Sequence, residues 1–136
     1  MRAALVQLTV GDDPQANLPE TLTYLRVAAA GGADLVLTPE CTGLLSSSRD
    51  HQRRVLRTEA EDETLAALRA EAREIGIPVL VGSLGLLTGD ADGRFANRSF
   101  LIGADGEIVA RYDKIHMFDV NVSETEVYRE SAAYRP

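Results

Sequence analysis

The feature that most constrains the fold is an alternation of short apolar runs with segments of helical periodicity over the first 81 residues. Strand-like runs occupy residues 2–9, 33–38 and 78–81, and apolar residues recur at helical spacing in residues 17–30 and 62–75. Strands that alternate with helices favour a sheet with parallel strands on which the helices pack. The sequence therefore predicts an α/β fold with flanking helices.

Local signals set the expected ends of both helices. Asn17, followed by Glu20 three residues later, is expected to cap the first helix, and Gly31 is expected to end it. The second helix is expected to begin after Asp62 and to end at Gly76. Both helices would present leucines to the sheet as core contacts.

The pattern of the second half favours a hairpin. Residues 97–102 and 107–112 are strand-like, and the turn sequence Gly-Ala-Asp-Gly between them favours antiparallel pairing, so we expect a mixed sheet. Residues 42–59 show little periodicity and are interpreted as an exposed loop or a short irregular helix. Beyond Lys114 no further element is recognisable, although the residues after Glu130 resemble the approach to another strand.

Composition narrows the class of protein. A length of 136 residues with 45% hydrophobic and 26% charged residues is typical of one globular domain. The 21 acidic residues outnumber the 14 basic ones, and the net charge of −7 argues against nucleic acid and membrane surfaces as partners. The chain starts without the apolar segment of a signal peptide, and we expect it to be cytoplasmic. Its single cysteine excludes an internal disulfide.

Two separated segments carry a charged side chain at the end of an apolar run. Glu40 follows residues 33–38, and Lys114 follows residues 107–112. Each alone is most simply an exposed residue at a strand end. Brought together by two strand ends, however, a carboxylate and an ammonium would supply a general base and a group that stabilises an oxyanion. Such a pair still requires a nucleophile.

Other catalytic and binding patterns are weak. The sequence has no G-x-S-x-G segment, and Gly82 to Gly85 is interpreted as a loop after a strand rather than as a nucleophile turn. His116 and Asp119 could contact a metal, but the only other histidine, His51, lies in a distant segment. Glycine-rich phosphate-binding patterns are absent from the sequence. We therefore expect neither a metal nor a nucleotide cofactor.

Five segments, in order, resemble the nitrilase (carbon-nitrogen hydrolase) superfamily. They are Val6-Gln7-Leu8, Leu37-Thr38-Pro39-Glu40-Cys41, Asn97-Arg98-Ser99-Phe100, Arg111-Tyr112-Asp113-Lys114-Ile115-His116-Met117-Phe118-Asp119 and Tyr128-Arg129-Glu130-Ser131. Within the superfamily the chain is most similar to the Nit-type amidases, the branch that holds omega-amidase and deaminated glutathione amidase. The resemblance runs from Arg2 to Pro136.

The resemblance implies an α-β-β-α sandwich with mixed sheets, of which residues 1–136 would form the first half, an incomplete N-terminal portion of the domain. It also implies a Glu-Lys-Cys mechanism, in which Glu40 is the general base, Lys114 stabilises the tetrahedral intermediate and Glu130 is a supporting carboxylate. The family's nucleophilic cysteine lies beyond the second glutamate and is expected to be missing here. Cys41 follows Glu40 directly, so in extended backbone its side chain would point to the opposite side, and it is interpreted as a small buried hydrophobe.

The implied activity is hydrolysis of small carboxyamides without a cofactor, in a homo-oligomer. The isolated chain would then be inactive, with apolar sheet surface left uncovered. Two alternatives remain open: a non-catalytic α/β binding or assembly module that retains the scaffold, and an amidase half that contributes Glu40 and Lys114 to a cysteine from another chain. The sequence leaves amide, nitrile and carbamoyl substrates undistinguished.

Overall fold

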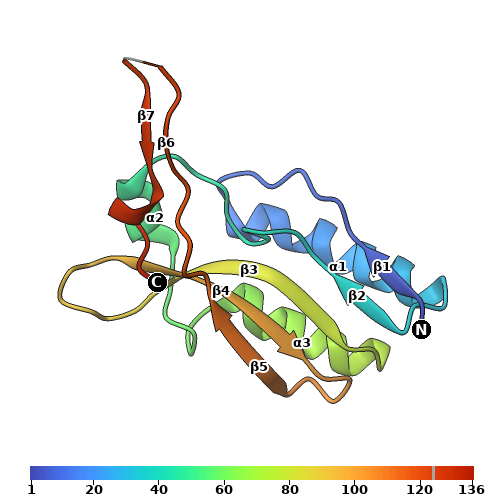
Figure 1. Ribbon diagram of the computed structural model, residues 1–136. Helices are drawn as coiled ribbons and strands as arrows, with labels where there is room; N and C mark the ends of the chain where they lie inside the picture. Colours follow the sequence, from blue (N-terminus) through green and yellow to red (C-terminus); the bar gives the residue numbers. More distant parts are fainter. Residues whose placement is uncertain (124) are drawn as a thin grey trace.

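The computed structural model describes residues 1–123 and 125–136 and contains one five-stranded sheet (Figure 1). In spatial order the strands are β1 (Ala3–Leu5), β2 (Leu35–Leu37), β3 (Val79–Leu87), β4 (Phe95–Ile102) and β5 (Ile108–Asp113). The first three strands run parallel, and β4 and β5 continue the sheet in antiparallel fashion. The predicted α/β class with a mixed sheet is confirmed.

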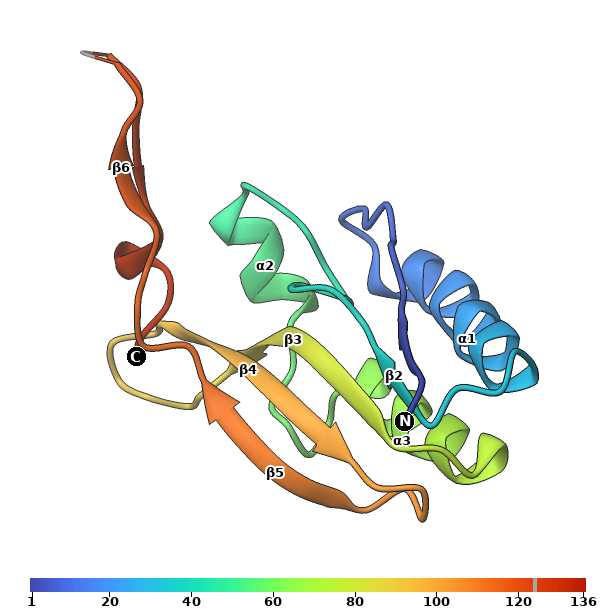
Figure 2. The ribbon, with the colours of Figure 1, turned by 45° about the vertical axis from the view of Figure 1, so that its right-hand side comes forward.

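Helices α1 (Pro14–Ala30) and α3 (Glu63–Ile75) pack on the same face of this sheet (Figures 1 and 2). Their apolar sides meet the sheet in one core of twelve buried residues, namely Leu25, Ala33, Val36, Leu65, Leu68, Ala72, Val79, Val81, Leu84, Leu86, Phe100 and Ile102. Because side chains alternate along a strand, the neighbours of these core residues face the other way. On that side Leu5 is 79% exposed and Tyr112 is 55% exposed. The expectation of uncovered apolar sheet surface agrees with this exposure.

The predicted ends of α3 are correct, whereas the predicted start of α1 is wrong. The Asp62 carboxylate accepts a hydrogen bond from the backbone of α3, and Gly76 ends that helix with a left-handed φ of 67°. Helix α1 instead begins at Pro14 with Asp13 as its cap. Proline at the first helical position has a suitable φ and needs no donor, which favours this earlier start. The Asn17 side chain instead accepts a hydrogen bond from the Gly11 N–H and donates to the carbonyl oxygens of Gly11 and Gly43.

Residues 42–59 contain a short helix, one of the two alternatives expected, whereas residues 78–87 differ from expectation. The helix α2 (Arg49–Val55) is regular, and its cap is Ser48. Residues 78–87 contain the long strand β3, which continues through Gly82 to Gly85, the residues interpreted from sequence as a loop. Pairing with β4 over most of its length stabilises this glycine-containing strand, and the pairing shifts in register between Val81 and Leu84.

The chain beyond Lys114 forms a second small sheet that the sequence did not predict. Strands β6 (Asp119–Asn121) and β7 (Val127–Arg129) pair as a hairpin that projects from the body of the molecule (Figure 2), and a 3₁₀ turn follows at Glu130–Ala132. Tyr134 then forms an isolated parallel bridge with Phe95 at the start of β4. In the described part of the chain, no helix is both long and apolar enough to cross a membrane.

Candidate active site

The structure brings Glu40, Lys114 and Glu130 together. The Lys114 Nζ atom lies 3.1 Å from Glu40 Oε1 and 2.9 Å from each carboxylate oxygen of Glu130. These residues come from the segment after β2, the end of β5 and the 3₁₀ turn, respectively. The sequence-based expectation that the two charged strand ends meet is therefore consistent with the geometry.

The backbone holds Lys114 at the end of β5. Its N–H donates to the Asn97 carbonyl at 2.9 Å, which extends the β4–β5 pairing by one residue. Just before it, Asp113 accepts two hydrogen bonds from the Arg98 guanidinium, at 2.5 and 2.8 Å, and Arg98 also contacts Glu59 at 2.8 Å. A bidentate arginine–carboxylate pair fixes orientation as well as distance. This pair links β4 to the residue that precedes Lys114.

A tight turn holds Glu40. The Thr42 hydroxyl lies 2.7 Å from the Pro39 carbonyl and 2.7 Å from the Thr38 hydroxyl, and the Cys41 N–H donates to Ser83 Oγ at 2.9 Å. Cys41 has a φ of 57°, so the extended backbone expected at this position is wrong. The left-handed conformation is costly for a residue with a side chain, and the surrounding hydrogen bonds stabilise it.

Cys41 is also less buried than expected, with intermediate exposure. Burial and the neighbouring Glu40 carboxylate raise the pKa of its thiol to about 11. A thiol with so high a pKa is protonated at neutral pH, and the thiolate is the nucleophilic form. This environment is unsuited to a reactive cysteine.

The Glu40 turn leaves no room for a side chain at Gly82 on β3. A Cβ at this position would lie 2.4 Å from the Thr38 carbonyl oxygen and 2.5 Å from the Pro39 carbonyl oxygen. We expect Gly82→Ala to lower the free energy of unfolding by about 1–3 kcal/mol, because the turn must move away from the strand. Denaturant unfolding measures this change. Gly11→Ala is the matched control, since a Cβ at Gly11 meets only Asn17 Oδ1 at 3.6 Å; equal losses in both variants would contradict the prediction.

Glu130 is the most buried of the three charged residues, with a side chain 8% exposed. Besides the Lys114 ammonium, it accepts a hydrogen bond from the Phe118 N–H at 2.5 Å. A buried carboxylate is costly unless such partners surround it. Glu130 therefore ties the Lys114 ammonium to the segment that leads into β6.

The electrostatic environment keeps both ends of the Glu40–Lys114 pair charged. Burial acts to raise the Glu40 pKa, but hydrogen bonds from Asn97 and Lys114 outweigh it, and the pKa is lowered. Burial acts to lower the Lys114 pKa, but hydrogen bonds to Glu130 and Glu40 outweigh it, and the pKa is raised. At neutral pH the site thus holds a carboxylate able to accept a proton and an ammonium able to stabilise negative charge.

Lys114 is the only lysine in the chain, so its titration can be measured directly. Reductive methylation with ¹³C-formaldehyde labels Lys114 and the N-terminal amine alone. We expect the Lys114 pKa to be higher in the folded chain than in urea, and to fall toward the urea value in Glu130→Gln. Because the folded pKa is the higher one, the ammonium stabilises the fold below the unfolded pKa, and this contribution disappears as pH rises through the folded pKa. Identical titrations in folded and unfolded chains would contradict the expectation.

Sequence reasoning missed one direct contact of the site. Asn97 is 3% exposed on β4, and its Nδ2 donates to Glu40 Oε1 at 2.7 Å. Asn97 belongs to one of the five segments that resemble the nitrilase superfamily, but that resemblance assigned it no role. The available signal was an asparagine at the start of a strand-like run, because an amide that becomes buried in a sheet needs hydrogen-bond partners.

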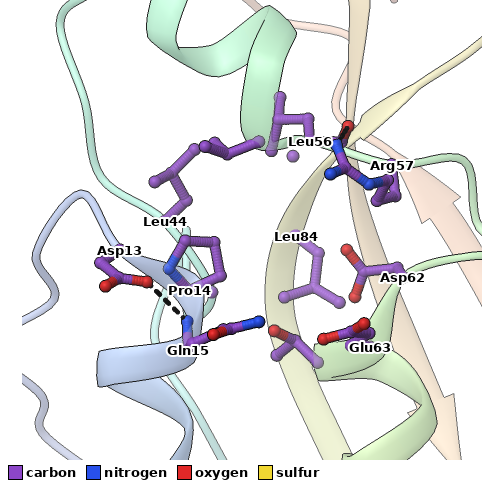
Figure 3. Close-up of a pocket in the computed structure, with 13 residues that line it drawn as sticks. Asp13, Pro14, Gln15, Leu44, Leu56, Arg57, Asp62, Glu63 and Leu84 are labelled. Carbon is purple, nitrogen blue, oxygen red and sulfur yellow. Dashed lines mark hydrogen bonds between the residues drawn. The ribbon is translucent and has the colours of Figure 1, made fainter.

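A separate cavity lies between the N-termini of α1 and α3 (Figure 3). It has a volume of about 200 Å³, and Asp13, Arg57 and Asp62 are among its lining residues. None of the three charged site residues lines it. Within residues 1–123 and 125–136, no group of three or more histidine, cysteine, aspartate or glutamate side chains is arranged to hold a metal ion.

Comparisons with known proteins define the family. Residues 2–136 match the family model for carbon-nitrogen hydrolases. The chain is 33% identical to deaminated glutathione amidase of Yersinia enterocolitica, over 98% of the chain and 46% of that protein. It is 28% identical to the omega-amidase of Homo sapiens, over 99% of the chain and 47% of that protein.

Solved structures agree with this assignment. An amidase from Nesterenkonia sp. matches with a TM-score of 0.77 at 29% identity, over 100% of this chain and 48% of the amidase chain. The NitFhit protein of C. elegans matches with a TM-score of 0.86 over 98% of this chain and 32% of the other, and at 23% identity it shows the fold alone.

The chain belongs to the carbon-nitrogen hydrolase family. Its similarity is to the Nit-type amidases of that family, and it spans about half the length of the curated relatives that it matches. The resemblance inferred from the sequence is confirmed, including the match to an N-terminal portion.

Proposed function

We propose that this chain is the N-terminal part of a cytoplasmic, homo-oligomeric amidase that hydrolyses small carboxyamides without a cofactor. One observation carries the proposal: the Lys114 ammonium contacts both Glu40 and Glu130 within 3.1 Å. A base, a cationic donor and a carboxylate that orients the donor are the parts required for acyl transfer to a thiol, apart from the thiol itself.

The nucleophilic thiol is proposed to come from outside residues 1–136. The raised pKa of Cys41 argues against that residue. That the nucleophile is a cysteine is supported by a glutamate-to-glutamine mutant of the Nesterenkonia amidase, in which acrylamide or the acetamide moiety of fluoroacetamide is added at the active site cysteine. A half that supplies Glu40 and Lys114 to a cysteine of another chain is the remaining variant of this proposal.

In the proposed reaction Glu40 takes the thiol proton, and the thiolate sulfur attacks the amide carbonyl carbon. The negative charge that develops on the carbonyl oxygen is stabilised by the Lys114 ammonium, whose position Glu130 maintains. The proton on Glu40 then passes to the leaving nitrogen, and ammonia departs. Water, deprotonated by Glu40, attacks the thioester, so that the acid and the free thiol are released.

Ammonia release from the omega-amides of dicarboxylic acids tests the proposal. The 136-residue chain alone should release none, whereas the polypeptide of its intact reading frame should be active. Turnover by residues 1–136 alone would overturn the assigned mechanism. If the chain alone is inactive, mixing it with a separately expressed second half distinguishes a thiol supplied by another chain.

The exposed apolar side of the sheet favours one other function, that of a non-catalytic binding or assembly module. Leu5 and Tyr112 would then contact a partner rather than the rest of a sandwich. The module function requires no proton transfer, so Glu40→Gln should leave every phenotype unchanged. Under the amidase proposal, the same variant abolishes most of the ammonia release.

A further inference from the structure

The two hydrogen bonds to Glu40 converge on a single oxygen. Asn97 Nδ2 lies 2.7 Å from Glu40 Oε1, and Lys114 Nζ lies 3.1 Å from the same atom. Among residues 1–123 and 125–136, no donor is bonded to Oε2. The carboxylate is therefore held at one oxygen, and the other remains available to accept a proton.

Asn97 contacts both members of the charged pair. Its side chain bonds to Glu40, while its carbonyl oxygen accepts the Lys114 N–H at 2.9 Å. On its other side, Asn97 pairs with Gly85 of β3, so the residue lies in an interior strand of the sheet. An exchange of its amide nitrogen and oxygen would place an oxygen against the Glu40 carboxylate, which is repulsive, so the carboxylate itself fixes the orientation of the amide.

The other side-chain atom of Asn97 gives independent support. Its Oδ1 is buried and has no hydrogen-bond partner within the described part of the chain. A buried amide oxygen without a hydrogen-bond partner destabilises the folded chain. An apolar residue would avoid that cost, so the asparagine is explained better by its contact with Glu40 than by stability of the strand.

We infer that Asn97 is a positioning residue, which holds Glu40 by Oε1 and so presents Oε2 to the attacking thiol. This inference rests on the proposed amidase function and assigns one oxygen of the general base to proton transfer. Asn97 itself touches neither substrate nor thiol in this scheme. It acts through the carboxylate and through the backbone of Lys114.

Several groups set the charge around Glu40. Lys114 and Asn97 stabilise the carboxylate, whereas burial raises its pKa. Glu130 reaches the same ammonium from the 3₁₀ turn, and the Cys41 thiol and the Tyr134 hydroxyl are the other titratable groups nearby. Lys114 still contacts Glu40 when the Asn97 amide is removed, so the loss of that amide should change the titration of Glu40 without discharging the site.

Carboxyl ¹³C NMR titration of the 136-residue chain tests the inference. In Asn97→Ala the Glu40 pKa should rise, because the carboxylate loses its shortest hydrogen bond. In Asn97→Asp it should rise further, because two neighbouring carboxylates oppose double ionisation. Asn121→Ala is the matched control, since the Asn121 side chain bonds to Arg129 on the hairpin, and it should leave Glu40 unchanged. An unchanged Glu40 pKa in folded Asn97→Ala would overturn the inference.

If the Asn97 variants fail to fold, a measurement on the unsubstituted chain still tests the inference. One Asn97 side-chain amide proton should lie downfield and should move with the Glu40 titration, as expected for a proton shared with that carboxylate. No response of this signal would also overturn the inference.

The activity assay separates failure of the proposed function from failure of this inference. If the proposed function is wrong, the polypeptide of the intact reading frame releases no ammonia, whatever the NMR titration shows. If that frame is active, Asn97→Ala should lower kcat at least tenfold with little change in KM, and should move the acid limb of the pH profile upward.

Discussion

Glu40→Gln in the polypeptide of the intact reading frame is expected to lower kcat for amide hydrolysis by about 100- to 10,000-fold, the usual contribution of a general base. The variant keeps the shape of the side chain and can still accept a hydrogen bond from Lys114. It cannot take the thiol proton at Oε2. Stopped assays of ammonia release over a range of substrate concentrations measure kcat and KM separately.

The control for this variant is Glu20→Gln, which makes the same chemical change at an exposed position on α1. It should retain full activity. The KM in Glu40→Gln should change less than kcat, because proton transfer contributes to the transition state rather than to ground-state binding. Retention of kcat within threefold by folded Glu40→Gln would remove Glu40 from the reaction and would favour the module function.

The location of the charged residues was predictable because apolar runs mark strand ends. Residues 33–38 and 107–112 stop just before Glu40 and Lys114, so the two charges were expected near the ends of strands of one sheet. The structure adds why they meet: β2 and β5 are separated by β3 and β4, and the turn at Cys41 carries Glu40 across to Asn97. Long-range register of this kind is not contained in a periodicity pattern.

Other parts were not predictable for specific physical reasons. Gly82 and Gly85 have poor strand propensity. Gly85 pairs with Asn97 of β4, whereas Gly82 lies in the register shift between Val81 and Leu84, and a periodicity pattern reports neither feature. At the start of α1 both Asp13 and Asn17 suit a cap, and the proline at position 14 decides between them through its fixed φ. Most residues of strands β6 and β7 are exposed, so neither strand has a buried face that would give an alternating apolar pattern in the sequence.

The sequence also contained a signal for Lys114 that periodicity does not report. The chain uses arginine at 13 positions and lysine at one. An ammonium is a compact charge, whereas a guanidinium is a planar fork suited to bidentate pairing. At Lys114 a single nitrogen must reach three carboxylate oxygens from two glutamates at 2.9–3.1 Å, which the compact group does well.

This geometry makes Lys114→Arg informative, because the charge is retained and the shape is changed. A guanidinium is expected to pair bidentately with Glu130 and to lose the single-atom contact that also reaches Glu40. We therefore expect a loss of about 100- to 1,000-fold in kcat, comparable to removal of one oxyanion donor. Lys114→Met should be at least as inactive and less stable, because it leaves the Glu130 carboxylate buried with the Phe118 N–H as its remaining partner.

The matched control is the opposite substitution, arginine to lysine, at a position outside the Glu40–Lys114–Glu130 site. Arg111→Lys keeps a cation opposite Glu59, and since the Arg111 side chain is 46% exposed, the substitution should change stability little and activity not at all. If Lys114→Arg retained full activity, positive charge alone would be sufficient and the requirement for a compact ammonium would be wrong. If Lys114→Arg were inactive but folded, with the Glu40 pKa raised above that of the native chain, the loss would be traced to the broken Lys114–Glu40 contact, since that bond lowers the Glu40 pKa in the native site.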